Sequence, residues 1–227
     1  MKKYELTEDF ITVFGVKLYR IKALVTFGNV EVGELGGYIE KEANLSHEGD
    51  AWVSDNAQVR GNAHVCDNAH VCDNAHVCDN TRVSGNTEVC DNAQVRGNAH
   101  VCDNAHVCDN AHVCDNAHVC DNTRVSGNAE VCDNAQVRGN AWVDNDTDVC
   151  GNAWIDNDAG YASVKGFGRR FRNTTFFKQR DGSIGVVCGC FIGTLDEFRK
   201  KVKETHADTK FAKEYLAISD LMEFHFN

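Results

Sequence analysis

A branched aliphatic residue stands at every sixth position from Val53 to Ile155, without one interruption. Seventeen of these residues are Val and the last is Ile, so the repeat covers nearly half of the chain. A fixed short period without insertions is typical of a solenoid, in which each repeat packs on its neighbours. This run constrains the fold more than any other feature, and it predicts one elongated stack of repeats.

The composition of the repeat predicts its local structure. The commonest unit is V-C-D-N-A-H, as in residues 101–106, and the residue two before each aliphatic is Ala fourteen times and Thr four times. Residues two apart on a strand point to the same face, so one aliphatic and one small residue per unit face a narrow interior. The Asp-Asn and Gly-Asn pairs between them favour corners, because Asn and Gly tolerate positive φ and Asn can bond nearby backbone.

The pattern aliphatic-x-x-x-small-x, repeated in sixes, resembles that of the bacterial hexapeptide-repeat family. The resemblance implies a mainly β fold: a left-handed parallel β-helix, or triangular solenoid, with three repeats per coil and about six coils here. General rules for parallel crossovers would favour the right-handed alternative. At about 4.8 Å per coil the rod would be roughly 29 Å long. Backbone hydrogen bonds between coils and Asn ladders at the corners are expected to hold it together.

The N-terminal segment is predicted to cap the first coil. Phe10–Phe14 and Val16–Ile21 surround Gly15 and predict a β-hairpin. A cap is expected because an open solenoid end exposes unpaired backbone and core. We therefore divide the chain into an N-terminal β cap (1–44), the hexapeptide-repeat β-helix (45–161) and a C-terminal cap (162–227).

The C-terminal segment predicts a ββαα cap. Two β-rich stretches flank Asp181-Gly182, which is a strong hairpin signal. Thr194 and Glu197 form the pattern of a capping box at the start of a helix. Asp208 is predicted to cap a second helix with an apolar side that carries Phe211, Tyr215, Ile218 and Met222.

Both ends sharpen the resemblance. Residues 33–39 (GELGGYI) resemble the leader that precedes the coils in YdcK-like hexapeptide proteins, and residues 189–198 (GCFIGTLDEF) resemble a tail that recurs in phage proteins. The resemblance covers almost the whole chain and implies an association with a phage or prophage. Such proteins are named transferases from the fold alone, which is an analogy and says nothing about a site.

Charge is distributed unevenly along the chain. Residues 53–158 contain 15 Asp, 2 Glu and 5 Arg, a net charge of −12, and the rest of the chain carries +1. A basic stretch interleaved with Phe follows the repeats, which indicates possible contact with an anion or a partner. Its candidate contact residues are Arg169, Arg170, Arg172, Lys178 and Arg180.

Ten of the twelve Cys residues occupy the outward position after the repeated aliphatic. Because in-register neighbours on parallel strands are a poor arrangement for bridging, we expect free thiols in a reducing cytoplasm. The first eight residues lack the apolar core of a signal peptide, and no apolar run near 18 residues predicts a membrane span. The expected localisation is cytoplasmic.

Catalytic and metal sites are not expected. Hexapeptide acyltransferases resemble this rod but carry a catalytic His near a loop that projects between coils, and here the hexads are unbroken, so no catalytic or cofactor-binding residue is predicted. Stacked coils would bring four weak zinc candidates to one face, although their spacing is unfavourable for tetrahedral ligation. These are His100, Cys102, His118 and Cys120; a second weak set is Cys188, Cys190 and His206.

The internal history of the repeat also argues against a surface site on the rod. Asp55–Cys90 is a 36-residue block, and Asp91–Cys132 is nearly the same block with one extra unit. With three repeats per coil, the longer block moves the next copy by one face, so Arg138 leaves the face of Arg60 and Arg96. An insertion of six residues therefore preserves the fold but changes which outward side chains lie above one another on each face.

The leading hypothesis is a non-enzymatic structural or interaction scaffold without a cofactor, acting through a protein partner or self-association as a monomer or homotrimer. Nucleic acid is not the expected ligand. One alternative is an acyltransferase-like enzyme. Another is an acidic decoy for a nucleic-acid-binding protein, with Asp73, Asp91 and Asp109 in one column. The basic end of one rod could also meet the acidic flank of another.

Overall fold

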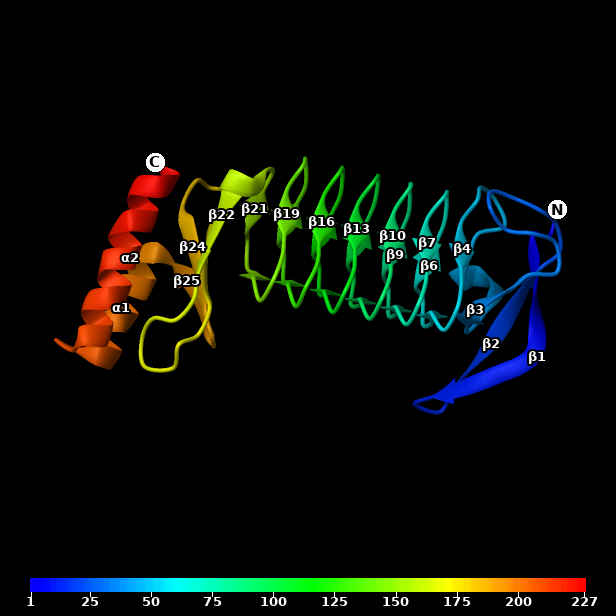
Figure 1. Ribbon diagram of the computed structural model, residues 1–227, viewed down its shortest axis with the longest axis horizontal. Coiled ribbons are helices and arrows are strands. Elements are labelled where there is room, and N and C mark those ends of the chain that lie inside the picture. Colours follow the sequence, from blue (N-terminus) through cyan, green and yellow to red (C-terminus); the bar gives the residue numbers. More distant parts are fainter.

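The computed structural model describes residues 1–227 as an elongated molecule (Figure 1). A solenoid of short parallel strands forms the middle, an antiparallel hairpin lies at the N-terminal end, and two helices lie at the other end. The predicted mainly β solenoid with its two kinds of cap is thereby confirmed. The left-handed sense of the coils stays a prediction from the resemblance.

Each hexad forms one two-residue strand, which consists of the inward aliphatic and the outward residue before it. In chain order these strands are β4 (Trp52–Val53), β5 (Gln58–Val59), β6 (His64–Val65), β7 (His70–Val71), β8 (His76–Val77), β9 (Arg82–Val83), β10 (Glu88–Val89), β11 (Gln94–Val95), β12 (His100–Val101), β13 (His106–Val107), β14 (His112–Val113), β15 (His118–Val119), β16 (Arg124–Val125), β17 (Glu130–Val131), β18 (Gln136–Val137), β19 (Trp142–Val143), β20 (Asp148–Val149) and β21 (Trp154–Ile155).

The short strands form three parallel sheets, one for each face of the solenoid. Every strand pairs in register with the strand three hexads away, as Val95 does with Val77 and Val113. Three hexads therefore make one coil, as expected. The repeated aliphatics are fully buried, and the Ala or Thr two residues before each is at most 2% exposed, so the interior is as narrow as the repeat predicts.

The solenoid has about seven turns, one more than the repeat suggests. Strand β3 (Leu35–Ile39) pairs in parallel with β5, and Leu45 forms a parallel bridge with Val65. Ile39 and Leu45 are thus the first two aliphatics of the first turn. Eight residues separate Leu45 from Val53 instead of six, which hides this turn from the sequence pattern.

The corners combine a left-handed backbone with ladders of side chains. The residue in the left-handed region is the Asp or Gly of each pair rather than the Asn, as for Asp103 with φ of 64°. The Asn instead forms the predicted ladder: Asn104 Nδ2 donates to Asn122 Oδ1 one coil on, at 3.1 Å. The Asp103 carboxylate accepts the Asp121 N–H at 3.4 Å, so both polar side chains of a corner connect successive coils.

The N-terminal cap is the predicted hairpin. Strands β1 (Tyr4–Val13) and β2 (Val16–Ala23) are antiparallel, and Phe14 and Gly15 both adopt positive φ in the turn. The fully buried Tyr4 donates its hydroxyl to Leu45 O at 2.8 Å, just after the 3-10 turn η1 (Glu42–Asn44). The cap therefore covers the first coil.

The C-terminal module is a four-stranded antiparallel sheet covered by two helices. Its predicted hairpin and the capping box of Thr194 and Glu197 are confirmed. The predicted cap of the second helix is wrong by one residue, because the Thr209 side chain, not that of Asp208, accepts the Ala212 N–H. The elements after the 3-10 turn η2 (Asp158–Gly160) are β22 (Tyr161–Val164), β23 (Thr174–Lys178), β24 (Ile184–Cys188), β25 (Phe191–Thr194), α1 (Leu195–His206) and α2 (Lys210–Phe226).

The sheet of this module separates two cores. Phe177 and Val187 belong to the long core that runs through the solenoid, whereas Phe176 and Val186 pack with Phe198 and the helices. The alternation follows from the two faces of a strand. None of the helices has the length and apolar character needed to cross a membrane.

Candidate functional site

The C-terminal module contains a pocket of about 420 Å³ beside helix α1. Three of its cations come from the loop between β22 and β23, and the fourth comes from α1. They are Arg169, Arg170, Arg172 and Lys201. None of these four side chains has a carboxylate within 4.0 Å. The pocket therefore presents an excess of positive charge in a chain whose net charge is −11.

The backbone around Arg172 accommodates its guanidinium group. Gly189 adopts φ of 63°, and a Cβ atom added there would collide with Arg172 Nη1. Glycine is favoured at this position because it tolerates the left-handed region and lets Arg172 keep this place without moving its guanidinium group. The turn between β24 and β25 allows Arg172 to lie against it at the pocket.

An apolar wall completes the pocket. Phe191, Phe198 and Val202 line it together with Tyr215, which is 6% exposed. The Tyr215 hydroxyl lies 3.9 Å from Cys188 Sγ and donates to Phe167 O at 3.4 Å. Burial, with a smaller contribution from Cys188, raises the pKa of Tyr215 to about 12, so its hydroxyl stays neutral at physiological pH. The pocket is suited to an anion that also carries an apolar group.

The structure divides the predicted basic contact into two parts. Arg169, Arg170 and Arg172 line the pocket, but Lys178 and Arg180 do not. The Arg180 guanidinium lies over the Trp154 ring, 5.3 Å from its centroid. Lys201 also lines the pocket but was not predicted from the sequence. Its only signal there is its place on the predicted helix, three residues after the apolar Phe198.

The second weak metal set lies in the same pocket. Cys188, Cys190 and His206 all line it, and the His206 ring stacks on Tyr215 with centroids 5.9 Å apart. No three potential ligand atoms from this set lie within 4.8 Å of one another. These side chains therefore belong to the wall of the pocket and do not form a ready ligand cluster.

The first metal set is brought to one face but not into one group. The rings of His100 and His118 stack with centroids 4.9 Å apart. Burial and the neighbouring His118 lower the pKa of His100. Cys102 and Cys120 instead cluster with Asp103, with ligand atoms within 4.8 Å. The two imidazoles form one pair and the two thiols form another. The pairs stay apart because each Cys is two residues after its His along the strand.

Several Cys residues form rows along the solenoid, which we call cysteine columns. The columns are Cys72, Cys90 and Cys108 on one face, Cys114, Cys132 and Cys150 on the second, and Cys102 and Cys120 on the third. Each column follows from an unbroken stack of in-register strands.

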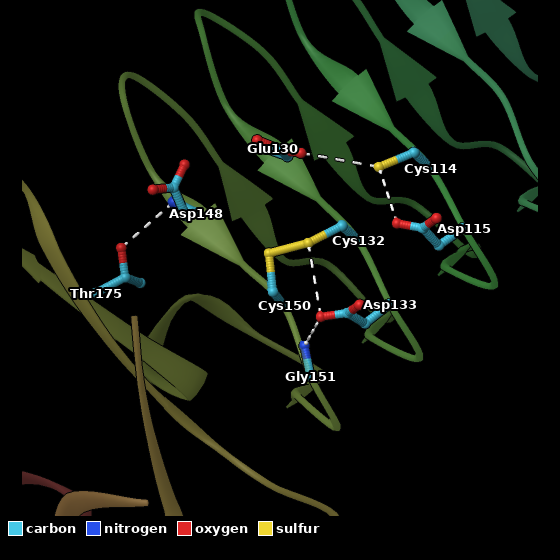
Figure 2. Close-up of a disulfide and its surroundings, with 9 residues drawn as sticks. All are labelled: Cys114, Asp115, Glu130, Cys132, Asp133, Asp148, Cys150, Gly151 and Thr175. Carbon is cyan, nitrogen blue, oxygen red and sulfur yellow. Dashed lines mark hydrogen bonds between the residues drawn. A yellow bond between two sulfur atoms is a disulfide. The ribbon is translucent and has the colours of Figure 1, made fainter. Parts of the chain in front are cut away.

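The expectation that all these thiols are free is wrong, because Cys132 and Cys150 form a disulfide (Figure 2). Their Cα atoms lie 4.7 Å apart. The spacing between coils thus lies inside the range of about 4.4–6.8 Å that disulfides need, and in-register strands permit bridging. Beside the bridge, the Asp133 carboxylate accepts the Gly151 N–H at 3.0 Å.

The acidic column predicted at one corner is present, and its carboxylates have a structural role. Asp73 accepts the Asp91 N–H at 3.3 Å, and Asp91 accepts the Asp109 N–H at 3.1 Å. Each carboxylate thus bonds the backbone of the next coil.

A scan against protein-family models finds no match for this chain, and no curated protein matches it.

Proposed function

We propose that this chain is a non-enzymatic interaction scaffold, in which the solenoid is a spacer and the C-terminal module binds an anionic segment of a protein partner. The single observation that carries the proposal is the pocket lined by four cationic side chains that have no carboxylate partner. The resemblance to YdcK-like proteins supports a place for this scaffold in a phage or prophage.

The chemistry of the pocket indicates the kind of segment that would bind. Grouped cations repel one another, and an anion between them would relieve that repulsion and gain charge-assisted hydrogen bonds. Three of the four are Arg, whose planar guanidinium matches a carboxylate in a bidentate manner. Phe191 and Phe198 would add apolar contact. An acidic peptide with one aromatic or branched apolar residue fits this combination.

The direct test is a titration of a fluorescent peptide that is rich in Glu and contains one Phe. Binding should weaken as salt is added, and the double variant Arg169→Ala/Arg170→Ala should raise Kd by at least about tenfold, which corresponds to 1.4 kcal/mol. The matched control is Lys178→Ala, which removes a cation of the same stretch outside the pocket and should leave Kd unchanged. Equal losses in both variants would contradict a specific role for the pocket.

The identity of the partner can be narrowed by light scattering across salt concentrations. A mass that rises at low salt, and no longer rises in the Arg169→Ala/Arg170→Ala variant, would identify the acidic solenoid of a second copy as the partner. A native mass spectrum tests the alternative of an acyltransferase-like enzyme. Coenzyme A retained on the purified protein would contradict a non-enzymatic scaffold.

A further inference from the structure

The cysteine columns present their thiols in repeated, equivalent positions. Each Cys follows a buried Val, and, except for Cys150 in the last coil, its N–H donates to the carbonyl oxygen of the Val one coil further on. At Cys132, which forms the disulfide, the distance from its backbone N to Val149 O is 3.0 Å. It is 3.0 Å for Cys90 to Val107, 2.9 Å for Cys102 to Val119 and 2.9 Å for Cys114 to Val131. The backbone geometry that permits one disulfide is therefore repeated at every neighbouring pair.

The side chains of the reduced pairs also come together. Cys72 and Cys90 gather with Glu88, and Cys90 and Cys108 gather with Asp91, in groups whose ligand atoms lie within 4.8 Å. Cys102 and Cys120 form a third such group. The thiols of these pairs thus meet in space as well as in register, whereas the Cys114 thiol is in register with Cys132 and contacts Asp115 and Glu130.

Two further repeat Cys residues lack such a neighbour. Cys66 has Ser46 and Ser84 at the equivalent positions one coil before and after it. Cys78 lies between Arg60 and Arg96 on its face. The chain therefore contains its own unpaired controls, with the same local sequence and backbone geometry.

We propose that the three cysteine columns are disulfide ladders, in which any two neighbours of a column can be joined and the bridge of a three-membered column moves along it. A soluble disulfide such as oxidised glutathione would supply the oxidation. Two thiols lose two protons and two electrons as their S–S bond forms, and the soluble disulfide is reduced to two thiols. Nothing else is consumed.

Movement of a bridge needs no oxidant. The thiolate of Cys114 attacks Cys132 Sγ, the Cys114–Cys132 bond forms, and the Cys132–Cys150 bond breaks. Cys150 leaves as the thiolate and takes up the proton that Cys114 lost. Figure 2 shows Cys114 on the same face as the bridge, one coil before Cys132. A three-membered column thus holds one bridge and one thiol, and the two exchange places.

The surroundings of Cys114 set the pH dependence of this exchange. Burial, the hydrogen bond and charge of Asp115 and the charge of Glu130 together raise the pKa of the Cys114 thiol to about 12, and Arg96 opposes them. Because the thiolate is the nucleophile, exchange should be slow at neutral pH. Its rate should increase about tenfold per pH unit below that pKa, since the thiolate fraction increases by that factor.

Disulfide mapping by trypsin digestion, followed by fragmentation of the linked peptides in a mass spectrometer, distinguishes the possible bridges. Cleavage follows Arg60, Arg82, Arg96, Arg124, Arg138 and Lys165, and fragmentation locates the linked Cys in a peptide that contains several. The reduced protein is oxidised with glutathione disulfide, alkylated and digested. A Cys132–Cys150 bridge joins peptides 125–138 and 139–165, whereas Cys114–Cys132 joins 97–124 and 125–138. In the first column, Cys72–Cys90 joins 61–82 and 83–96. We expect these links, with Cys66 and Cys78 alkylated or carrying glutathione.

Two variants test the ladder directly. Cys150→Ser should move the bridge to Cys114–Cys132, and Cys108→Ser should place that of the first column at Cys72–Cys90, which gives a second test if one variant fails to fold. The control Cys78→Ser should leave the map unchanged. A folded Cys150→Ser protein in which Cys132 stays free or carries glutathione would overturn the proposal, as would bridges that involve Cys66 or Cys78.

Discussion

The solenoid and the C-terminal module treat their charged groups in opposite ways. The solenoid carries a charge of −12, yet its corner carboxylates accept backbone N–H groups of the next coil, as Asp73 does from Asp91. The module has a net charge of smaller magnitude. However, four of its cationic side chains, Arg169, Arg170, Arg172 and Lys201, have no carboxylate within 4.0 Å. A charge without a partner inside the chain, rather than the total charge, therefore marks the surface that is available to a ligand.

The two regions also differ in their cores. The solenoid interior is a repeated stack of Val with Ala or Thr, and each coil contacts its neighbours along the axis. The module buries aromatic side chains such as Phe176 and Phe198 in a separate core. Four experiments test whether the two cores are stabilised separately, and they are ordered by the expected change in the free energy of unfolding.

The largest effect is expected from Val101→Asp inside the solenoid. Val101 is fully buried in a narrow apolar interior, so an unpaired carboxylate there should cost at least about 4 kcal/mol of unfolding free energy. Urea unfolding followed by circular dichroism measures the loss. The control His100→Asp changes the adjacent outward residue and should leave stability within about 0.5 kcal/mol. Similar losses in both would contradict the alternation of inward and outward positions.

A somewhat smaller effect is expected from Phe198→Ala in the module. Removal of this buried ring should cost about 4 kcal/mol. Because the module has its own core, hydrogen exchange should accelerate in α1 and α2 while the coils stay protected. Phe224→Ala is the control, since Phe224 is 84% exposed on α2. Uniform loss of protection along the whole chain would show that the two cores unfold as one.

Reduction of the disulfide should destabilise the solenoid by about 3 kcal/mol, since the bridge closes a loop with a sequence separation of 18. Thermal unfolding with and without a reducing agent measures this difference. The Cys132→Ser variant lacks this bridge, so it should lose the same stability, and its response to the reducing agent should be smaller by that amount. A Cys78→Ser variant should keep the response of the unaltered protein.

The smallest effect is a gain. The hydroxyl of Thr123 is buried in the interior without a hydrogen-bond partner, at a position that is Ala in most units. Thr123→Val keeps the shape and removes the unsatisfied group, so the free energy of unfolding should rise by about 1 kcal/mol. Thr81→Val and Thr87→Val should give similar gains in urea unfolding, because their hydroxyls are equally unpartnered. Losses in all three would mean that these hydroxyls are satisfied.

The sequence predicts the solenoid well because a strict period leaves the chain few choices. The strand positions, the inward residues, the corner ladders and both caps follow from alternation and turn chemistry. The first turn escapes notice because its spacing departs from six, although Ile39 and Leu45 supply its aliphatics. The repeat alone cannot locate the pocket, since Lys201 and Arg172 meet only through the packing of α1 on the sheet.

The prediction that Cys132 and Cys150 are free thiols is wrong for a different reason. The sequence predicts the column, and the strand spacing of about 4.8 Å lies inside the range of about 4.4–6.8 Å that disulfides need between Cα atoms. In-register neighbours one coil apart can therefore bridge, as the Cα–Cα distance of 4.7 Å between Cys132 and Cys150 shows. A pattern therefore predicts which residues are neighbours more readily than which covalent chemistry they undergo.

The extra hexad in the second block has a consequence for the direction in which the module points. Since three hexads make one coil, each single hexad gained or lost turns everything after it by one third of a turn about the solenoid axis. Gains of three hexads lengthen the molecule and restore the original direction. A recombination within the repeat is thus a change of orientation as well as of length, and it moves the pocket around the axis relative to the N-terminal hairpin while both ends keep their own structure.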